Sequence, residues 1–495
     1  MIYKSSRNCS LTANACEAVL RGIAPDGGLY MTDDFLPQQQ DLKALLKKSD
    51  LAIAEDIVGG LLPDFGKDCI GDIISASYEN KFEGGALAPL VAVGSKFVLE
   101  LYHGPTCAFK DIALSVLPQL MAAARKKLGV QGQTLILTAT SGDTGKAALE
   151  GFSGADGIRI IVFYPKDGVS EVQRLQMVTS AGGNVAVCGV RGNFDDAQNA
   201  VKEIFSRSKT LNPLPKKQLL SSANSINIGR LVPQITYYFC AYRDLINRGA
   251  LSAGTRVNFA VPTGNFGDIL AGYMAKLMGL PVAKLICASN ENNVLTDFLR
   301  TGVYNRHRDF VKTSSPSMDI LISSNLERLL FLLLGDNETA RLMDELRERG
   351  EYSIGENALQ TLRESFDCGF CSQNKTLDTI GQVYAKHSYL LDPHTAVAWR
   401  VATEFDRASG NGCPTVVLST ASPYKFCNTV LAALGEEIDG GEFAAMEKLH
   451  LMTGVTIPEK LRTLQALPVL HRDEEDLDKL WDYVLRKAGE ENWNR

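Results

Sequence analysis

From about residue 86 onward, short apolar segments alternate with stretches of helical periodicity, and this alternation constrains the fold more than any other feature. Seven apolar segments predict strands, because they are nearly continuous runs without an in–out alternation. Such strands are buried on both faces, which a parallel sheet covered by helices provides. The sequence therefore predicts an α/β protein with open, mostly parallel sheets and flanking helices. The predicted strands span residues 96–102, 134–140, 158–165, 184–190, 256–262, 283–289 and 415–420.

The remaining segments predict helical additions to these sheets. Residues 1 to about 85 have helical periodicity, interrupted by a turn-rich segment at 24–30. A charged, mostly helical insert is expected between the strands, and the acidic C-terminal tail is typical of a solvated amphipathic helix. We expect a helical N-terminal region at 1–85, two interleaved α/β units at 86–294 and 386–440, a helical insert at 295–385 and a C-terminal helical segment at 441–495.

The composition and net charge limit the kinds of molecule that the chain is expected to bind. The chain has 495 residues, 45% of them hydrophobic, and a net charge of −6, which excludes a disordered chain and argues against nucleic acid or an anionic membrane as a partner. We expect a cytoplasmic protein without a membrane anchor, because the N-terminus lacks a secretory h-region and no long apolar stretch follows. The 11 cysteines form no disulfide framework, and the isolated pair Cys368 and Cys371 predicts no metal site.

Polar residues at the strand-to-helix junctions are the candidates for chemistry, because ligands of open α/β folds gather at the carboxyl ends of strands. Residues 263–268, Thr-Gly-Asn-Phe-Gly-Asp, precede an apolar helix. Two glycines allow close backbone approach, and a helix N-terminus attracts anions, so this segment predicts a phosphate cradle. It is equally well explained as a plain turn in which Asp268 caps the helix.

At three further strand-to-helix junctions the sequence allows both a functional and a purely structural explanation. Residues 141–145 open a helix and either bind an anion or cap that helix. Lys110 heads an apolar helix, where a cation opposes the helix dipole; it is either a neutral amine suited to Schiff-base chemistry or a lysine that reaches solvent. The hydroxyls of residues 419–422 either bond a buried heteroaromatic nitrogen or cap the next helix.

The order and spacing of these motifs decide between the alternatives. HGPTCAFKD, TSGDTGKAA, NSINIGRLVPQITYYF, PTGNFGDILAGY, SPSMDI, DPHTAVA and LSTASPYKF follow one another from residue 103 to residue 426. With YKSSR and APDGGLY near the start, they resemble the longer branch of the threonine synthase family over about residues 2–470. The resemblance implies a pyridoxal-phosphate enzyme of fold type II, like the β subunit of tryptophan synthase.

The resemblance assigns roles to individual residues. It implies that Lys110 is the Schiff-base lysine and that Thr420 is the partner of the pyridine nitrogen. It implies that the phosphate loop is formed by Gly264, Asn265, Phe266, Gly267 and Asp268. Candidates for substrate binding are Thr140, Ser141, Asp143 and Thr144, followed by Asn224, Ser225, Asn227 and Arg230.

The chain departs from the family pattern at three places. The family often has His at the position of Ser422, an aromatic residue at Ile228, and Ser-Thr-Arg-Gly where residues 5–8 read Ser-Ser-Arg-Asn. None of these changes removes a residue assigned to the cofactor. The change at Ser422 bears on contacts with the substrate.

The activity implied is the last step of threonine biosynthesis, in which O-phospho-L-homoserine and water give L-threonine and phosphate. We expect a monomer or homodimer with this small-molecule substrate. Two alternatives stay open: a related phospho-lyase that releases 2-oxobutyrate, and a catalytically silent homologue with a binding role. Retention of Lys110, the loop at 264–268 and Thr420 argues against the silent homologue.

Overall fold

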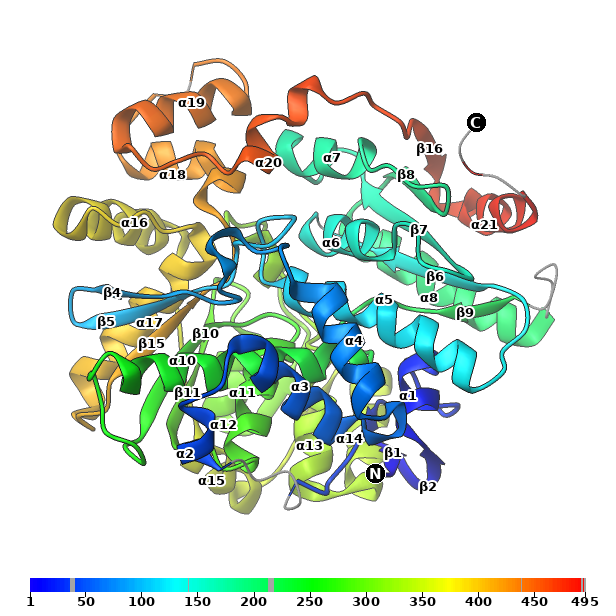
Figure 1. Cartoon of the computed structure of the whole chain (residues 1–495), viewed down its shortest axis with the longest axis horizontal. Helices are drawn as coiled ribbons and strands as arrows, with labels where there is room; N and C mark the ends of the chain where they lie inside the picture. The colour runs from blue at the N-terminus through cyan, green and yellow to red at the C-terminus, as the bar shows by residue number, and fades with distance from the viewer. Residues whose placement is uncertain (36–40, 141, 212–217, 438, 491–492, 494–495) are drawn as a thin grey trace.

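The chain folds around two sheets whose strands are mostly parallel (Figure 1). The computed structural model describes residues 1–35, 41–140, 142–211, 218–437, 439–490 and 493. Each of the seven predicted strands is present, with ends that lie within two residues of the prediction. The prediction of open, mostly parallel sheets is confirmed.

The first sheet has six strands in the order β14-β11-β10-β15-β5-β4, and its strands are parallel except for the antiparallel pair β4 and β5. Its central strands are buried along their length, as their apolar sequences require. The bounds are β4 (Leu90–Val93), β5 (Lys96–Glu100), β10 (Val257–Pro262), β11 (Val282–Ser289), β14 (Phe366–Phe370) and β15 (Thr415–Ser419).

The second sheet has five parallel strands in the order β16-β8-β7-β6-β9. In Figure 1 it lies to the right of the first sheet. The bounds are β6 (Thr134–Ala139), β7 (Ile158–Pro165), β8 (Val185–Arg191), β9 (Leu219–Ser221) and β16 (Asp473–Asp476).

Helices follow most of the strands and cover both sheets. The central helix is α5 (Lys110–Lys127), which packs against α1, α4, α6 and α9 and is buried over most of its length. The other helices around the sheets are α1 (Ala15–Arg21), α3 (Asp50–Leu61), α4 (Lys67–Tyr78), α6 (Asp143–Phe152), α7 (Glu171–Val178), α8 (Phe194–Leu211), α9 (Ile228–Leu231), α10 (Ile235–Asn247), α11 (Gly267–Leu277), α12 (Val294–Thr301), α16 (Gln373–His387), α17 (Pro393–Ser409) and α18 (Cys427–Ala433).

The N-terminal region contains the expected helices and also a small sheet that the sequence analysis missed. Strands β1 (Tyr3–Ser5), β2 (Asn8–Ala13) and β3 (Tyr30–Met31) form an antiparallel sheet in the order β2-β1-β3. These strands are short, and β2 alternates between exposed and partly buried residues, so it lacks the continuous apolar pattern of the central strands. The region is therefore helical only in part.

Two edge strands correct the expected helical insert and tail. The insert contains α13 (Leu326–Leu334), α14 (Asp336–Arg349) and α15 (Glu356–Ser365), but it also supplies β14 to the first sheet. In the tail, the acidic segment β16 pairs with β8, and the amphipathic helix is α21 (Leu480–Gly489). An edge strand tolerates four acidic residues because its side chains reach solvent and basic neighbours such as Lys166 and Arg191.

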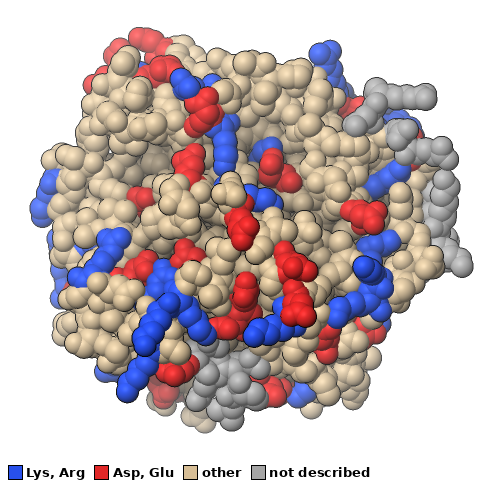
Figure 2. Space-filling model, in the orientation of Figure 1, with Lys and Arg blue, Asp and Glu red and all other residues tan. Residues whose placement is uncertain are grey.

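The surface agrees with the modest net charge. On the face seen in Figure 2, basic and acidic side chains are interspersed rather than gathered into areas of one sign. Within the described ranges, no helix is both long enough and apolar enough to span a membrane.

Candidate active site

One cavity of about 750 Å³ receives residues from all four strand-to-helix junctions selected in the sequence. Because β5, β15 and β10 are parallel neighbours in the first sheet, their carboxyl ends lie together, and β6 contributes from the second sheet. The four junctions are represented in its lining by Lys110, Thr140 with Thr144, residues 264–268, and Thr420.

Lys110 is the first residue of α5 and lines this cavity, although its side chain is almost entirely buried. Its Nζ donates a hydrogen bond to Oγ of Ser317 at 3.3 Å and lies 3.8 Å from Oδ2 of Asp143. Burial, helped by the charges of Lys425 and Arg230 and opposed by that of Asp143, lowers the pKa of Lys110 to about 8. A buried amine that is partly neutral near pH 7 is a nucleophile and a proton acceptor.

The segment from Gly264 to Asp268 runs from the loop after β10 into the first turn of α11, and each of its five residues lines the cavity. Two hydrogen bonds fix its backbone: Ser323 donates to the carbonyl of Gly264 at 2.7 Å, and the N–H of Asn325 donates to the carbonyl of Asn265 at 3.0 Å. Because the segment includes the N-terminus of α11, the first N–H groups of that helix are available to an anion. The segment thus has the features of an anion-binding loop.

Gly264 is required by a neighbouring backbone. A Cβ at this position would lie 2.7 Å from the carbonyl oxygen of Ser317, too close for any side chain. The sequence analysis expected the glycine to allow approach of a ligand, but the structure explains it by the contact between two loops of the protein. Gly264 therefore locks the anion-binding loop to the segment that also bonds Lys110.

Asp268 does not cap α11, which begins at Gly267. Its Oδ1 accepts hydrogen bonds from the hydroxyls of Tyr237 at 2.5 Å and Tyr238 at 2.9 Å. Burial raises the pKa of Asp268 to about 6. Its Oδ2 is buried and has no partner among the described residues.

The cavity wall also carries polar groups whose hydrogen bonds are not made within the described protein. These groups are the Thr420 hydroxyl, Nε of Arg230 and Oδ1 of Asn224; the last two atoms are buried. Arg230 donates through Nη1 to the carbonyl of Ala223 at 2.7 Å, but no carboxylate of the described chain pairs with it. Burial lowers the pKa of Arg230 to about 10, so it stays a cation near pH 7. An unpaired buried guanidinium is a binding group for an anion.

The remaining candidates divide between the cavity and its surroundings. Thr144 and Ser225 line the cavity, and Thr140 lines it while accepting from the N–H groups of Gly142 and Gly145 at 3.0 and 2.8 Å. Asn227 is placed elsewhere: its side chain caps α9 and donates to the carbonyl of Val19.

Asp143 does not line the cavity either, and its carboxylate faces Lys110 and Lys425. The prediction for Ser141 lies outside the described residues.

Ser317 and His394 line the cavity, and the sequence analysis gave them no role in the chemistry. Nε2 of His394 accepts from the N–H of Ser317 at 3.2 Å, and Nδ1 lies 2.8 Å from Oδ1 of Asp392, the residue that caps α17. The backbone N–H can only donate, so Nε2 is the acceptor and Nδ1 carries the proton toward Asp392. The motifs that contain these two residues, SPSMDI and DPHTAVA, are part of the family resemblance found in the sequence. Only the fold shows that Ser317 and His394 are in contact.

The N-terminal region also reaches the cavity. Arg7 lines it and forms two hydrogen bonds of 2.8 Å with the carboxylate of Glu327, which also accepts from Ser6 at 2.5 Å. The segment in which the chain departs from the family pattern therefore joins the insert at the cavity edge.

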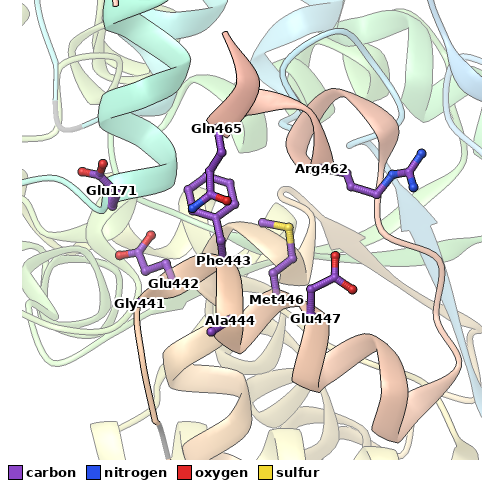
Figure 3. A pocket seen from close by; sticks show the side chains of 9 residues that line it. All are labelled: Glu171, Gly441, Glu442, Phe443, Ala444, Met446, Glu447, Arg462 and Gln465. Carbon is purple, nitrogen blue, oxygen red and sulfur yellow. The ribbon is translucent and has the colours of Figure 1, made fainter.

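A second cavity, of about 460 Å³, lies among α7, α19 (Glu442–Thr453) and the segment at 462–465 (Figure 3). Its side chains include Glu171, Glu442, Glu447 and Arg462, and none of the candidates that the structure describes lines it. Of these two cavities, only the first is lined by candidate residues from the sequence.

Comparisons with known proteins agree with this site. Residues 89–420 match the family "Pyridoxal-phosphate dependent enzyme", residues 2–78 match "Threonine synthase N terminus", and residues 395–473 match "Threonine synthase, C-terminal". The chain is 41% identical to threonine synthase of Pseudomonas aeruginosa, covering 87% of this chain and 90% of that protein.

Two further relatives extend the comparison. The crystal structure of PLP-bound threonine synthase from Brucella melitensis covers 99% of this chain and 100% of its own, with a TM-score of 0.86 and 37% identity. Human "Threonine synthase-like 1" is 40% identical over 92% of this chain, which spans only 61% of the length of that relative. The family matches, together with these identities and this coverage, show that the chain belongs to the threonine synthase family of pyridoxal-phosphate-dependent enzymes.

Proposed function

We propose that this chain converts O-phospho-L-homoserine and water to L-threonine and phosphate, with pyridoxal phosphate bound covalently at Lys110. The observation that carries the proposal is the meeting, in one cavity, of a buried lysine, an anion-binding loop and a buried arginine without a carboxylate partner. A cofactor with an aldehyde and a phosphate, and a substrate with a carboxylate and a phosphate, match these groups.

The residues fit the cofactor group by group. Lys110 would supply the amine for its aldehyde, the N–H groups of residues 264–268 would bind its phosphate, and the Thr420 hydroxyl would be available for its ring nitrogen. When bound, pyridoxal phosphate stabilises negative charge on the substrate carbons next to the amino group. The hydroxyl of Thr420 is uncharged, so it orients the ring by a hydrogen bond without supplying a counter-charge.

The substrate's anionic groups have a matching set of donors. We assign them to Arg230, to the side-chain NH2 of Asn224, and to the hydroxyls of Ser225, Thr140 and Thr144, all of which line the cavity. Asp143 is left out, because its carboxylate would repel a substrate anion, and Asn227 is left out because its side chain is used by α1 and α9. Charge-assisted hydrogen bonds of this kind contribute about 1.5–3 kcal/mol each.

Lys110 also suits the proton transfers that the reaction requires. With substrate bound to the cofactor, the free Lys110 amine would take the proton from Cα, pass it on, and only then take the proton from Cβ, because one amine holds one abstracted proton at a time. A group with a pKa of about 8 exchanges protons efficiently near neutral pH. Its hydrogen bond to Ser317 and its proximity to Asp143 hold Nζ at the cavity.

The alternative outcomes differ in product. A phospho-lyase would release 2-oxobutyrate and phosphate, and a silent homologue would release neither. We expect O-phospho-L-homoserine to yield threonine and phosphate in equal amounts, with Lys110→Ala as the inactive control. If the products are 2-oxobutyrate and phosphate in equal amounts, the chain is the phospho-lyase. If the protein is colourless and inactive, it is the binding homologue.

The cytoplasmic location and the monomeric or homodimeric state stay predictions from the sequence. The proposal concerns the reaction at this cavity and needs neither of them.

A further inference from the structure

Lys425 is a second buried lysine near Lys110. It lies in the short 3₁₀ helix η7 (Pro423–Phe426), and its side chain is fully buried. Its Nζ lies 2.7 Å from Oδ1 of Asp143 and donates to the carbonyl of Thr106 at 3.1 Å. Lysines are seldom fully buried unless they are paired, so this pair needs an explanation.

Asp143 lies between the two lysines. Its Oδ1 accepts from Lys425 and from Nε2 of Gln173 at 2.9 Å, while its Oδ2 is 3.8 Å from Nζ of Lys110. One carboxylate balances one full positive charge. With Lys425 already paired, a proton on Lys110 adds a charge that the cluster does not balance.

The other charged groups facing Lys110 do not change this balance. Arg230 on α9 adds positive charge, and Asp111, the next residue of α5, adds negative charge. The carboxylate of Asp111 is already used, because it accepts from the N–H and the hydroxyl of Thr106 at 2.8 and 2.6 Å. Burial alone would raise the pKa of Asp143. The charges of Lys425 and Lys110 nevertheless hold that pKa well below its usual range.

The pair also joins the two sheets at the site. Lys425 follows β15 of the first sheet, in the same segment as Thr420, whereas Asp143 begins α6 after β6 of the second sheet. We propose that Lys425 is a positioning residue that holds Asp143 through Oδ1, keeps Oδ2 toward Lys110 and cancels the carboxylate charge, so that the Lys110 amine loses its proton readily.

This inference rests on the proposed function only in that Lys110 is the residue that binds the cofactor. The test uses the full chain freed of cofactor, and measures the first-order rate of covalent capture at saturating pyridoxal 5'-phosphate from pH 6 to pH 10. Borohydride reduction and peptide mapping identify the modified lysine in each variant. Capture at another lysine would contradict the proposed function, whereas capture at Lys110 with an unchanged profile would contradict only this inference.

The variants are designed to shift the profile in opposite directions. Lys425→Met leaves Asp143 unbalanced and is expected to raise the midpoint by about one pH unit or more, whereas Asp143→Asn is expected to lower it. The double variant removes both charges and is expected to return the midpoint toward that of the unmodified chain. If Lys425→Met alone fails to fold, Asp143→Asn is still expected to lower the midpoint, and in the double variant the loss of the Lys425 charge is expected to raise it again.

Lys96→Met is the matched control, since Lys96 is also a buried lysine, paired with Asp406 at 2.7 Å in a part of the first sheet that does not line the cavity. It is expected to lower stability without moving the midpoint. The proposal would be overturned if the midpoint moved in the same direction in Lys425→Met and Asp143→Asn, or if it moved in neither variant. The pair would then have a structural role only.

Discussion

Two groups of residues at the cavity differ in how their charges and hydrogen bonds are satisfied. Asp143 and Lys425 form a buried pair whose atoms bond within the protein, and Lys110 lies beside that pair. Arg230 and Asn224 have buried atoms without partners in the described chain. The first group has its electrostatics set before any ligand arrives, whereas the second is completed only by a ligand. We therefore expect substitutions in the first group to change proton transfer and those in the second to change binding.

Removing Lys110 tests the first group most severely. Lys110→Ala is expected to abolish covalent attachment of the cofactor and to lower kcat by at least about 10⁴-fold, because the nucleophile and the proton-transfer group are lost together. Mass measurement after borohydride reduction checks attachment, and product assay checks turnover. Lys146→Ala is the control, since Lys146 lies in the adjacent α6 but pairs with Glu150. A reduced cofactor adduct in Lys110→Ala would contradict the assignment.

The pH dependence of cofactor capture also tests the first group, through the pKa of Lys110. Only the neutral amine attacks an aldehyde, and the pKa of Lys110 is lowered to about 8, so capture is expected to accelerate as pH rises and to level off above pH 8. Between pH 6 and the plateau the rate is expected to rise about 100-fold, since each unit below the pKa reduces the neutral fraction about tenfold. A midpoint near the ordinary lysine pKa would show that Lys110 is not buried as described.

Arg230 tests the second group. Arg230→Met is expected to raise KM for O-phospho-L-homoserine about 10–100-fold, through loss of a charge-assisted contact, while the midpoint of cofactor capture changes much less. Arg230→Lys keeps the charge but not the paired donors, so it is expected to recover only part of the affinity. Steady-state kinetics with both variants checks this. If the loss appears in kcat alone, Arg230 acts in the chemical step and the division of roles is wrong.

Gly264 tests the contact that positions the anion-binding loop. Gly264→Ala places a Cβ 2.7 Å from the carbonyl oxygen of Ser317, so one of the two loops must move. Overpacking of this kind costs about 1–3 kcal/mol, and we expect cofactor affinity to fall about 30-fold. Gly441→Ala is the control, because no described atom lies within 4 Å of a Cβ there and its φ is −81°. Equilibrium binding and thermal unfolding of both variants distinguish loop displacement from general destabilisation.

The sequence predicted the parts of the site that follow directly from strand order. Lys110, residues 264–268 and Thr420 each come just after a strand of the first sheet, so parallel strands bring them together. The sequence did not predict that Ser317 meets His394 or that Lys425 meets Asp143, because these contacts join segments far apart in the chain. Strand β16 was missed because four acidic residues carry no apolar pattern, and its place depends on an available sheet edge.

Thr420 is expected to have the smallest effect of the residues tested. Its hydroxyl is without a partner in the described structure, whereas the neighbouring Ser419 hydroxyl lies 2.9 Å from the hydroxyl of Thr395. Because the single proton of Thr395 goes to the carboxylate of Asp392, the Ser419 proton is used in the contact with Thr395, and Ser419 is a poor donor to the ring nitrogen. Thr420→Ala is expected to lower cofactor affinity and kcat by about fivefold each, since loss of one buried hydrogen bond costs about 1 kcal/mol.

Thr420→Ser is the conservative variant for this test and is expected to recover most of both quantities, because it keeps the hydroxyl. Thr420→Asp is expected to lower threonine formation further, since a carboxylate would hold a proton on the ring nitrogen that a hydroxyl does not. Cofactor binding and product analysis check the three variants. If Thr420→Ala retains full affinity and turnover, the ring nitrogen has another partner. The Thr420 hydroxyl then belongs with Arg230 and Asn224, the groups assigned to substrate binding.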